Sequence, residues 1–271
     1  MIGAAGYGAV EILADQPHLY APEVTPVELE NLCRRLAAAG LRVANINANT
    51  AAGYYGRAFW EPLFEPSLAN PAPAARRWRL HYTRRCIDFA VALGAPSVSI
   101  TAGRMVPGTP PAAGLELLQA SLRELLPYAA DRGIRLGVEY EPGLLVENCR
   151  ELLALLAAVD SPWLGANLDL GHSQVLGEDP AAVIAALGKR IVHLHLEDIR
   201  QRKHYHLIPG TGEMDFGRIF QALQQVGYAG FLTVELYTYP REPNRAARQS
   251  LAYLRAVADN LSRSGEVSCS G

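Results

Sequence analysis

The stretch IRLGVEYEP at residues 134–142 sets the expectation for the whole chain, because its pattern returns three more times. LGANLDLGH at 164–172, IVHLHLEDI at 191–199 and FLTVELY at 231–237 are also apolar, strand-like segments that each follow a predicted helix. Each of the four carries one residue that can bind a metal: in order, Glu139, Asp169, His195 and Glu235. A closed parallel barrel brings the carboxyl ends of its strands to one face. We therefore expect these four side chains to converge on a single cation.

The same alternation of strand and helix runs along the chain. Strand-like segments lie at residues 9–14, 42–47, 97–101, 135–141, 165–170, 191–196 and 231–236. Helical patterns lie at residues 26–39, 74–93, 112–132, 146–159, 180–187, 216–226 and 245–262. This alternation predicts βαβ units and a parallel sheet covered by helices. We therefore expect an α/β fold, a TIM (β/α)8-type barrel, as a single domain over residues 1–271.

The strand count is one short of a complete barrel. The chain begins MIGAAGYGAVEI, which has the pattern of a helix end running into a strand. The barrel is therefore expected to lack its first strand and most of its first helix, through either a shortened amino terminus or a genuinely open barrel. A missing strand would expose sheet edges, which proteins normally cover. A second subunit of a homo-oligomer could cover them.

The composition disfavours several classes of protein. Hydrophobic residues make up 49% of the 271 residues, enough for a sizeable core, and the formal net charge of −2 argues against a nucleic-acid partner. No apolar run reaches the roughly 20 residues of a membrane helix, and no signal-peptide pattern opens the chain. The four cysteines are scattered without a CxxC motif, which indicates free thiols in a reducing compartment. A cytoplasmic protein without a membrane partner is expected.

The longest irregular stretch, residues 48–73, is rich in aromatic side chains. It contains Tyr54, Tyr55, Phe59, Trp60 and Phe64. Long aromatic loops at a barrel mouth often form lids over the site. Packing of the same rings on the barrel rim is an equally good interpretation, and the sequence leaves both open.

Two carboxylates share one face of the strand predicted at residues 135–141. Glu139 and Glu141 are two positions apart, so strand alternation points both the same way. Buried carboxylates need a cation, a shared proton or an ion pair. We expect Glu139 to be the metal ligand and Glu141 to contact the substrate or support the site, with a structural salt bridge as the alternative.

The next strands carry histidines beside acidic residues. Asp169 is followed three residues later by His172, a pair that a helix cap alone would not explain. In HLHLED, His195 lies nearer the strand end and is expected to bind metal, whereas His193 lies deeper and is expected to be a hydrogen-bonded core histidine. Glu197 and Asp198 are candidates to orient the imidazole, as outer carboxylates do around metal-bound histidines.

The segment RKHYHLIPGTGEMDF separates the last two of these strands. His204 and His206 alternate with Tyr205, and the Pro-Gly-x-Gly turn would let the backbone approach a ligand closely. Histidines at this spacing could bind a second metal. A single metal with substrate-binding histidines is the preferred interpretation.

Together these motifs resemble the xylose-isomerase-like superfamily of sugar phosphate isomerases and epimerases, which includes the endonuclease IV branch. The motifs are GIRLGVEYEP, NLDLGH, HLHLEDI, PGTGEMDF and YAGFLTVEL. The resemblance implies that Glu139, Asp169, His195 and Glu235 bind one divalent metal, and that Glu139 and Glu235 also form the catalytic acid/base pair. It further implies substrate contacts from His172 and from His206, which occupies the position of a basic residue before the Pro-Gly loop.

The chain also departs from the endonuclease branch. That branch holds a metal cluster with extra histidines at early strand ends, where this chain has NINANT and SITAGR. His18 is the only early candidate. The deficit and the negative net charge make a metal-dependent apurinic endonuclease the weaker expectation.

The leading hypothesis is a divalent-metal-dependent isomerase or epimerase of a keto sugar or related polyol. The cation, which could be Mn, Mg, Co or Zn, would bind a carbonyl and a neighbouring hydroxyl while a glutamate removes the adjacent proton. A lyase or dehydratase acting on a keto sugar at the same site is the alternative. A non-catalytic barrel is a further one.

Overall fold

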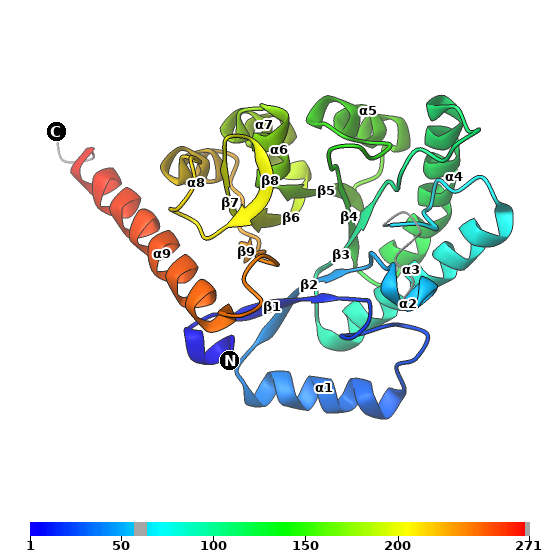
Figure 1. Ribbon diagram of the computed structural model, residues 1–271, viewed down its shortest axis with the longest axis horizontal. Helices are drawn as coiled ribbons and strands as arrows, with labels where there is room; N and C mark the ends of the chain where they lie inside the picture. Colours follow the sequence, from blue (N-terminus) through cyan, green and yellow to red (C-terminus); the bar gives the residue numbers. More distant parts are fainter. Residues whose placement is uncertain (57–63, 269–271) are drawn as a thin grey trace.

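The computed structural model describes residues 1–56 and 64–268, and side-chain surroundings are described up to residue 263 (Figure 1). One parallel sheet contains seven strands in the order β1-β2-β3-β4-β5-β6-β9. These strands are β1 (Ala9–Leu13), β2 (Arg42–Asn47), β3 (Ser97–Thr101), β4 (Arg135–Glu139), β5 (Leu164–Asp169), β6 (Ile191–Leu196) and β9 (Thr233–Val234). The α/β barrel expected from the sequence, with one strand fewer than a complete TIM barrel, is confirmed.

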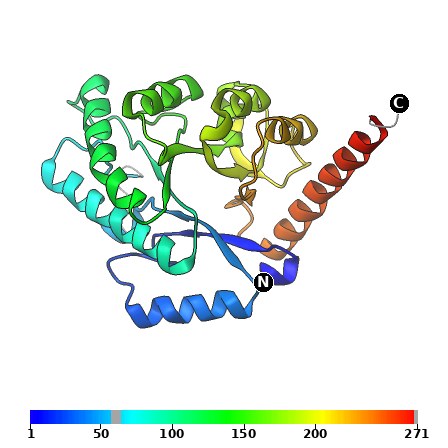
Figure 2. The same ribbon diagram turned by 180° about the vertical axis from the view of Figure 1, so that it is seen from behind.

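Helices cover the outside of this sheet, as Figures 1 and 2 show from opposite sides. They are α1 (Pro26–Ala38), α2 (Ala52–Tyr55), α3 (Pro73–Leu93), α4 (Pro111–Ala130), α5 (Cys149–Val159), α6 (Leu170–Leu176), α7 (Pro180–Leu187), α8 (Phe216–Gln225) and α9 (Pro243–Ser268). Two 3-10 turns, η1 (Gly3–Ala5) and η2 (Gly188–Arg190), complete the helical elements of the described chain. In both views the far end of α9 points away from the barrel.

Local sequence explains where the helices begin and end. Thr25 and Glu28 form a reciprocal capping box at the start of α1. Asn148 caps α5 through the backbone N–H of Glu151, so this helix starts three residues later than the predicted residue 146. Gly94 ends α3 with a φ of 69°, a left-handed conformation that glycine adopts without the steric cost of a Cβ.

The structure adds a hairpin that the sequence pattern did not indicate. Strands β7 (Asp198–Arg200) and β8 (Lys203–Leu207) pair antiparallel and form a separate two-stranded sheet. This hairpin places the HYH segment above the strand ends. The predicted strand at residues 231–236 is also wrong in length, because only two of its residues pair with β6.

The barrel wall is interrupted between its two edge strands. Within the described residues, β1 pairs only with β2 and β9 pairs only with β6. A cavity of about 800 Å³ lies between them, lined mainly by apolar side chains such as Val10, Val234 and Leu254. By contrast, the inner strands β3 and β5 are buried at every residue. The carboxyl ends of β4, β5 and β6 are therefore held in the closed part of the wall.

Tyr54, in the aromatic stretch, contacts both Tyr55, with ring centroids 4.7 Å apart, and a residue of α3. Tyr54 lies in α2, and its ring centroid is 4.4 Å from that of Trp78 on α3, in an edge-on arrangement. This contact corresponds to packing on the barrel rim. Phe59 and Trp60 lie outside the described residues.

No helix in the described parts of the chain combines the length and the apolar character that a membrane crossing requires.

Candidate metal centre

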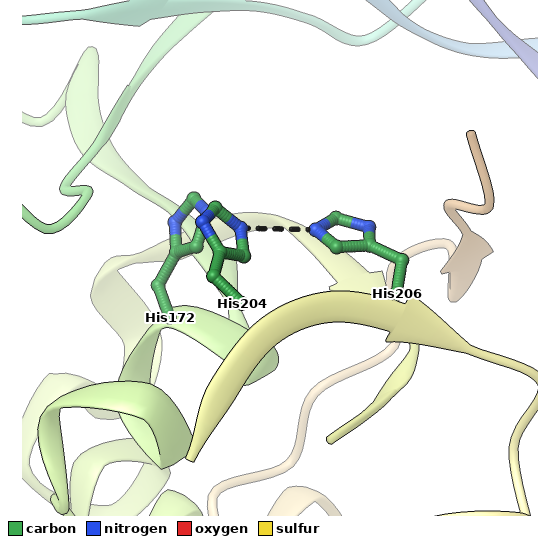
Figure 3. A group of neighbouring side chains, drawn as sticks. All are labelled: His172, His204 and His206. Carbon is green, nitrogen blue, oxygen red and sulfur yellow. Dashed lines mark hydrogen bonds between the residues drawn. The ribbon is translucent and has the colours of Figure 1, made fainter. Parts of the chain in front are cut away.

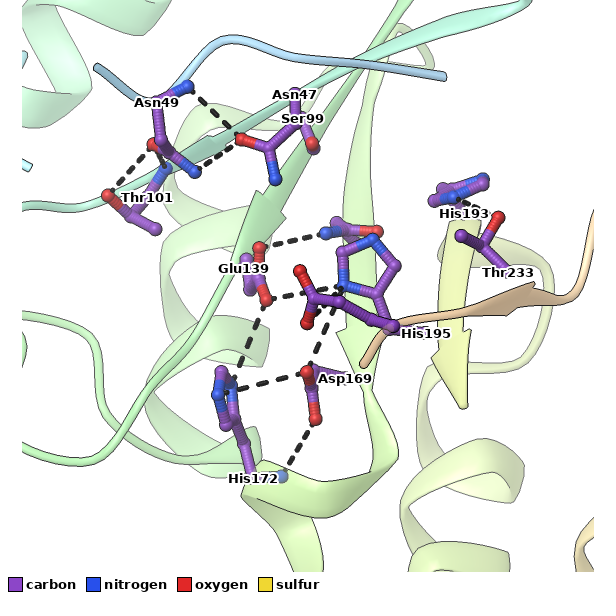
Figure 4. Close-up of polar contacts among 12 residues, drawn as sticks. Asn47, Asn49, Ser99, Thr101, Glu139, Asp169, His172, His193, His195 and Thr233 are labelled. Carbon is purple, nitrogen blue, oxygen red and sulfur yellow. Dashed lines mark hydrogen bonds and ion pairs between the residues drawn. The ribbon is translucent and has the colours of Figure 1, made fainter. Parts of the chain in front are cut away.

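Three of the four predicted ligands, Glu139, Asp169 and His195, come together at the carboxyl ends of adjacent strands (Figure 4). Glu139 is the last residue of β4, Asp169 is the last of β5, and His195 is next to last in β6. Their ligand atoms all lie within 4.8 Å of one another, and all three side chains are buried. Glu235 directly follows β9, and its side chain is 34% exposed.

The Nδ1 atom of His195 is the centre of this cluster. It lies 3.6 Å from Glu139 Oε1, 3.8 Å from Asp169 Oδ2 and 3.7 Å from Glu235 Oε2. These distances are longer than a hydrogen bond allows. Ligand atoms bound to one ion, however, typically lie about 3–4 Å apart, because metal–ligand bonds are about 2.0–2.2 Å long. The spacing is that of atoms arranged around a cation.

Two atoms of the cluster have no hydrogen-bond partner among the described residues. His195 Nδ1 and Asp169 Oδ2 are buried and make no hydrogen bond. Buried polar atoms are nearly always hydrogen-bonded, so this pair of atoms calls for a ligand between them. Three carboxylates and one imidazole form a hard donor set that suits Mn, Mg or Co and is also acceptable to Zn. The residues present therefore fit a divalent metal.

Hydrogen bonds from the protein fix the other oxygen of two carboxylates. Asp169 Oδ1 accepts the backbone N–H of His172 at 2.9 Å and caps α6. Glu139 Oε2 accepts from Asn167 Nδ2, also at 2.9 Å. Each carboxylate is thus anchored through one oxygen while the other faces His195. Asp169 combines the helix-cap role and the cluster role that the sequence presented as alternatives.

Charge and burial act against each other in this cluster. Burial raises the pKa of Glu235 to about 8, and the nearby carboxylates of Asp169 and Glu139 add to the shift against the lowering effect of His195. Burial alone would lower the pKa of His195, but Glu11 and Glu235 raise it well above its usual range. An excess of carboxylates around one imidazole is a favourable environment for a cation.

A histidine cluster borders this centre, formed by His172 on α6 and by His204 and His206 on β8 (Figure 3). Their ligand atoms lie within 4.8 Å of one another, and His204 Nε2 is 3.2 Å from His206 Nε2. His172 Nδ1 contacts the backbone carbonyl of Tyr140 at 2.8 Å. The three rings could bind substrate hydroxyls or, as the sequence also allowed, a second cation.

The protonation of this histidine cluster is uneven. Burial, together with the charges of His172 and His206, lowers the pKa of His204 to about 4. His204 is therefore neutral at physiological pH and can both donate and accept a hydrogen bond.

Burial also raises the pKa of Glu141 to about 7. The charge of His172 lowers this pKa, whereas the charges of Glu139 and Asp169 raise it further.

In the described structure neither Glu197 nor Asp198, the two carboxylates expected to orient His195, makes a hydrogen bond with its ring. Asp198 accepts hydrogen bonds from four backbone N–H groups and folds the Pro-Gly-x-Gly loop onto β7, so its predicted contact with His195 is wrong. Glu197 is fully buried, and neither of its carboxyl oxygens has a hydrogen-bond partner among the described residues. Burial and then the charge of Asp169 raise the pKa of Glu197 well above its usual range.

The residue that sequence reasoning missed is Glu11 on β1. Its Oε2 lies 2.9 Å from Nε2 of both His193 and His195. His193 also contacts Thr233 Oγ1 at 3.0 Å and is a hydrogen-bonded core histidine, as predicted. The available signal was a carboxylate in the middle of the apolar strand AVEIL.

Comparison with known proteins gives one consistent result. The chain is 31% identical over 261 residues to fructoselysine 3-epimerase of Shigella flexneri, covering 93% of this chain and 89% of that protein. It is 29% identical over 146 residues to inosose dehydratase of Lacticaseibacillus casei, covering 48% of this chain and 49% of the dehydratase. A crystal structure of a D-tagatose 3-epimerase-like protein shares the fold, with a TM-score of 0.80 at 22% identity over 96% of this chain and 91% of that one.

These relatives agree with the expectation of an enzyme of the sugar isomerase and epimerase type, and the dehydratases correspond to the alternative. The family match extends well beyond the site motifs and includes both edge strands of the sheet. Residues 2–257 match the family described as the xylose isomerase-like TIM barrel, and the chain therefore belongs to that family.

Proposed function

We propose that this protein is a divalent-metal-dependent epimerase or isomerase of a keto sugar or a related polyol. The observation that carries the proposal is the position of the two glutamates. Glu139 Oε1 and Glu235 Oε2 lie 3.6 and 3.7 Å from Nδ1 of His195, which has no hydrogen-bond partner in the described part of the chain. Two carboxylates on one cation site are what proton removal and proton return next to a carbonyl require.

Glu139, Asp169, His195 and Glu235 would hold the metal in this proposal. When bound, the cation supplies a Lewis acid and a template for a carbonyl and its neighbouring hydroxyl. Glu235 would be the base that removes the proton, because its side chain is 34% exposed and so more accessible to a substrate than that of Glu139, which is 7% exposed. Glu139 would return the proton, held in place by Asn167.

The substrate would lie between this centre and the histidine cluster. His172, His204 and His206 offer hydrogen-bonding groups suited to sugar hydroxyls, and Glu141 lies close enough to feel the charges of Glu139 and Asp169. The similarity to fructoselysine 3-epimerase supports the proposal that the reaction is an epimerisation. The free thiols of Cys33, Cys86 and Cys149 are in keeping with the reducing, cytoplasmic environment that we propose.

A dehydratase is the second candidate. It is favoured by the similarity to inosose dehydratase, which extends over about half of the chain. The first step would be the same removal of a proton beside a carbonyl, and only the departure of a hydroxyl group would differ. The metal site and the roles of the two glutamates would be unchanged.

The deciding experiment is incubation with a set of keto sugars and ketoinositols in deuterated water, with Mn, Co, Mg or Zn added in turn. Epimerisation or isomerisation would give a product with the same elemental composition as the substrate, except that one carbon-bound hydrogen has been replaced by deuterium. Dehydration would give a product lighter by one water. The Glu235→Gln variant should lower turnover by at least about 1000-fold if Glu235 is the base. Full activity in this variant would refute the assignment.

A further inference from the structure

Glu11 reaches across the open part of the barrel to the centre of the site. It lies on β1, at one edge of the sheet, whereas His195 lies on β6. Its Oε2 is 2.9 Å from Nε2 of His195, and its side chain is only 11% exposed. The opposite ring nitrogen, Nδ1, is the atom that faces Glu139, Asp169 and Glu235.

Glu11 is itself held in place. Asn45 Nδ2 donates to its Oε2 at 3.1 Å, and Asn47 Nδ2 approaches its Oε1 at 3.3 Å. Asn45 is in turn anchored on the neighbouring strand β3 by hydrogen bonds with Ser97 and Ser99. The carboxylate therefore meets His195 from a fixed direction.

We infer that Glu11 is a positioning residue, which accepts the Nε2–H of His195 and so keeps the Nδ1 lone pair aimed at the metal. A neutral imidazole carries its proton on only one nitrogen. A carboxylate on Nε2 selects the form in which that nitrogen is protonated and Nδ1 is free to coordinate. It also makes the imidazole a stronger ligand, the effect that outer carboxylates have on metal-bound histidines.

The inference rests on the metal centre proposed above, and a competing role has to be separated from it. Glu11 equally contacts His193, whose Nε2 also contacts Thr233 Oγ1. If Glu11 served only to tie β1 to β6, loss of either contact would lower stability and leave metal binding by the folded protein unchanged. His193→Gln is therefore the matched control for Glu11→Gln.

The test measures zinc and manganese affinity by calorimetry, with thermal unfolding recorded for each variant. Glu11→Gln should bind both metals about 10–100-fold more weakly than the wild type, whereas His193→Gln should stay within about 3-fold. Glu11→Asp keeps the charge but withdraws the carboxylate, and it should fall between the two. It also provides a reading if Glu11→Gln does not fold. Equal metal affinity in all folded variants would overturn the inference.

Nuclear magnetic resonance of ¹⁵N-histidine-labelled protein gives an independent reading. Zinc-loaded wild type should show His195 protonated at Nε2 and not at Nδ1. In metal-free wild type the Nε2 proton should be slow to exchange and shifted downfield, and Glu11→Gln should move it upfield. Absence of metal binding by the wild type would refute the proposed centre, while this proton would still report on Glu11. An Nε2 proton that is the same in both proteins would refute the role of Glu11.

Discussion

Asp169 and His172 are linked by a hydrogen bond that leaves half of the carboxylate free for the site. Asp169 Oδ1 accepts the backbone N–H of His172 at 2.9 Å, while Oδ2 faces His195 Nδ1 at 3.8 Å. The same interaction that starts α6 thus fixes both the orientation of the carboxylate and the position of His172. Loop geometry and ligand geometry depend on a single side chain.

Substitution of Asp169 should separate these two roles. Asn caps helices about as well as Asp, whereas Ala does not. We expect Asp169→Ala to be less stable than Asp169→Asn by about 1 kcal/mol in urea unfolding of the metal-free protein. Both should lose most of their metal affinity, because neither supplies a carboxylate. Equal stability of the two variants would show that the cap contributes nothing.

Stability of the metal-free protein should fall as the pH rises from about 4.5 to about 8. Folding raises the pKa of Glu235 to about 8 and that of Glu141 to about 7, from a usual value of 4.5. The folded protein holds these protons more tightly, so their stabilising contribution is complete below pH 4.5 and is lost as the pH passes 7 to 8. The raised pKa of His195 acts in the same direction. Glu235→Gln should flatten the plot of Tm against pH between about 4.5 and 8, and an unchanged slope would contradict this explanation.

Metal addition should reverse this loss at alkaline pH. A divalent ion at about 100 times its Kd stabilises the folded state by about 2.7 kcal/mol, which corresponds to a rise in Tm of about 5–10 °C for a chain of this size. Plasma mass spectrometry on protein purified without added metal should find about one ion per chain if the centre alone is filled, as expected from its single set of four ligands. Two ions per chain would instead assign the histidine cluster to a second metal.

His204 should contribute to substrate binding more than to turnover. Its loss as His204→Ala should raise KM about 3–10-fold, the effect of one hydrogen bond of about 0.5–1.5 kcal/mol, with kcat nearly unchanged. Because its pKa is lowered to about 4, this effect should be constant from pH 6 to 8. Tyr205→Ala is the control, since Tyr205 is 53% exposed and alternates with His204 along β8. A large fall in kcat would give His204 a role in the chemistry.

The sequence was sufficient for the seven strands of the barrel sheet, apart from the length of β9, and for the positions of the candidate ligands at or next to their carboxyl ends. Glu139, Asp169 and His195 could be predicted together because parallel strands bring their carboxyl ends to one face, whatever the separation in sequence. Glu235 could be included even though its strand is shorter than expected, since its position along the repeat is unchanged. The roles of these residues are still proposals that the experiments above address.

Two features could not be predicted, for different physical reasons. The β7–β8 hairpin turns at Gln201 and Arg202, whose φ angles are 52° and 54°. Such turns usually carry Asn or Gly, so the local sequence gave no turn signal. Glu11 was missed because its partners on β6 come close only through the curvature of the sheet, which no local periodicity encodes.

The pairing of the strands also determines which part of the site can yield. Strands β4, β5 and β6 each have a hydrogen-bonded neighbour on both sides, whereas in the described structure β9 is bonded on one side only. Segments with fewer backbone bonds open at lower free energy. In the proposed centre Glu235 would therefore be the ligand that yields most easily to admit substrate and release product, while Glu139, Asp169 and His195 would retain the cation. Substrate exchange and metal exchange would then proceed on separate timescales, with the ion residing through many turnovers.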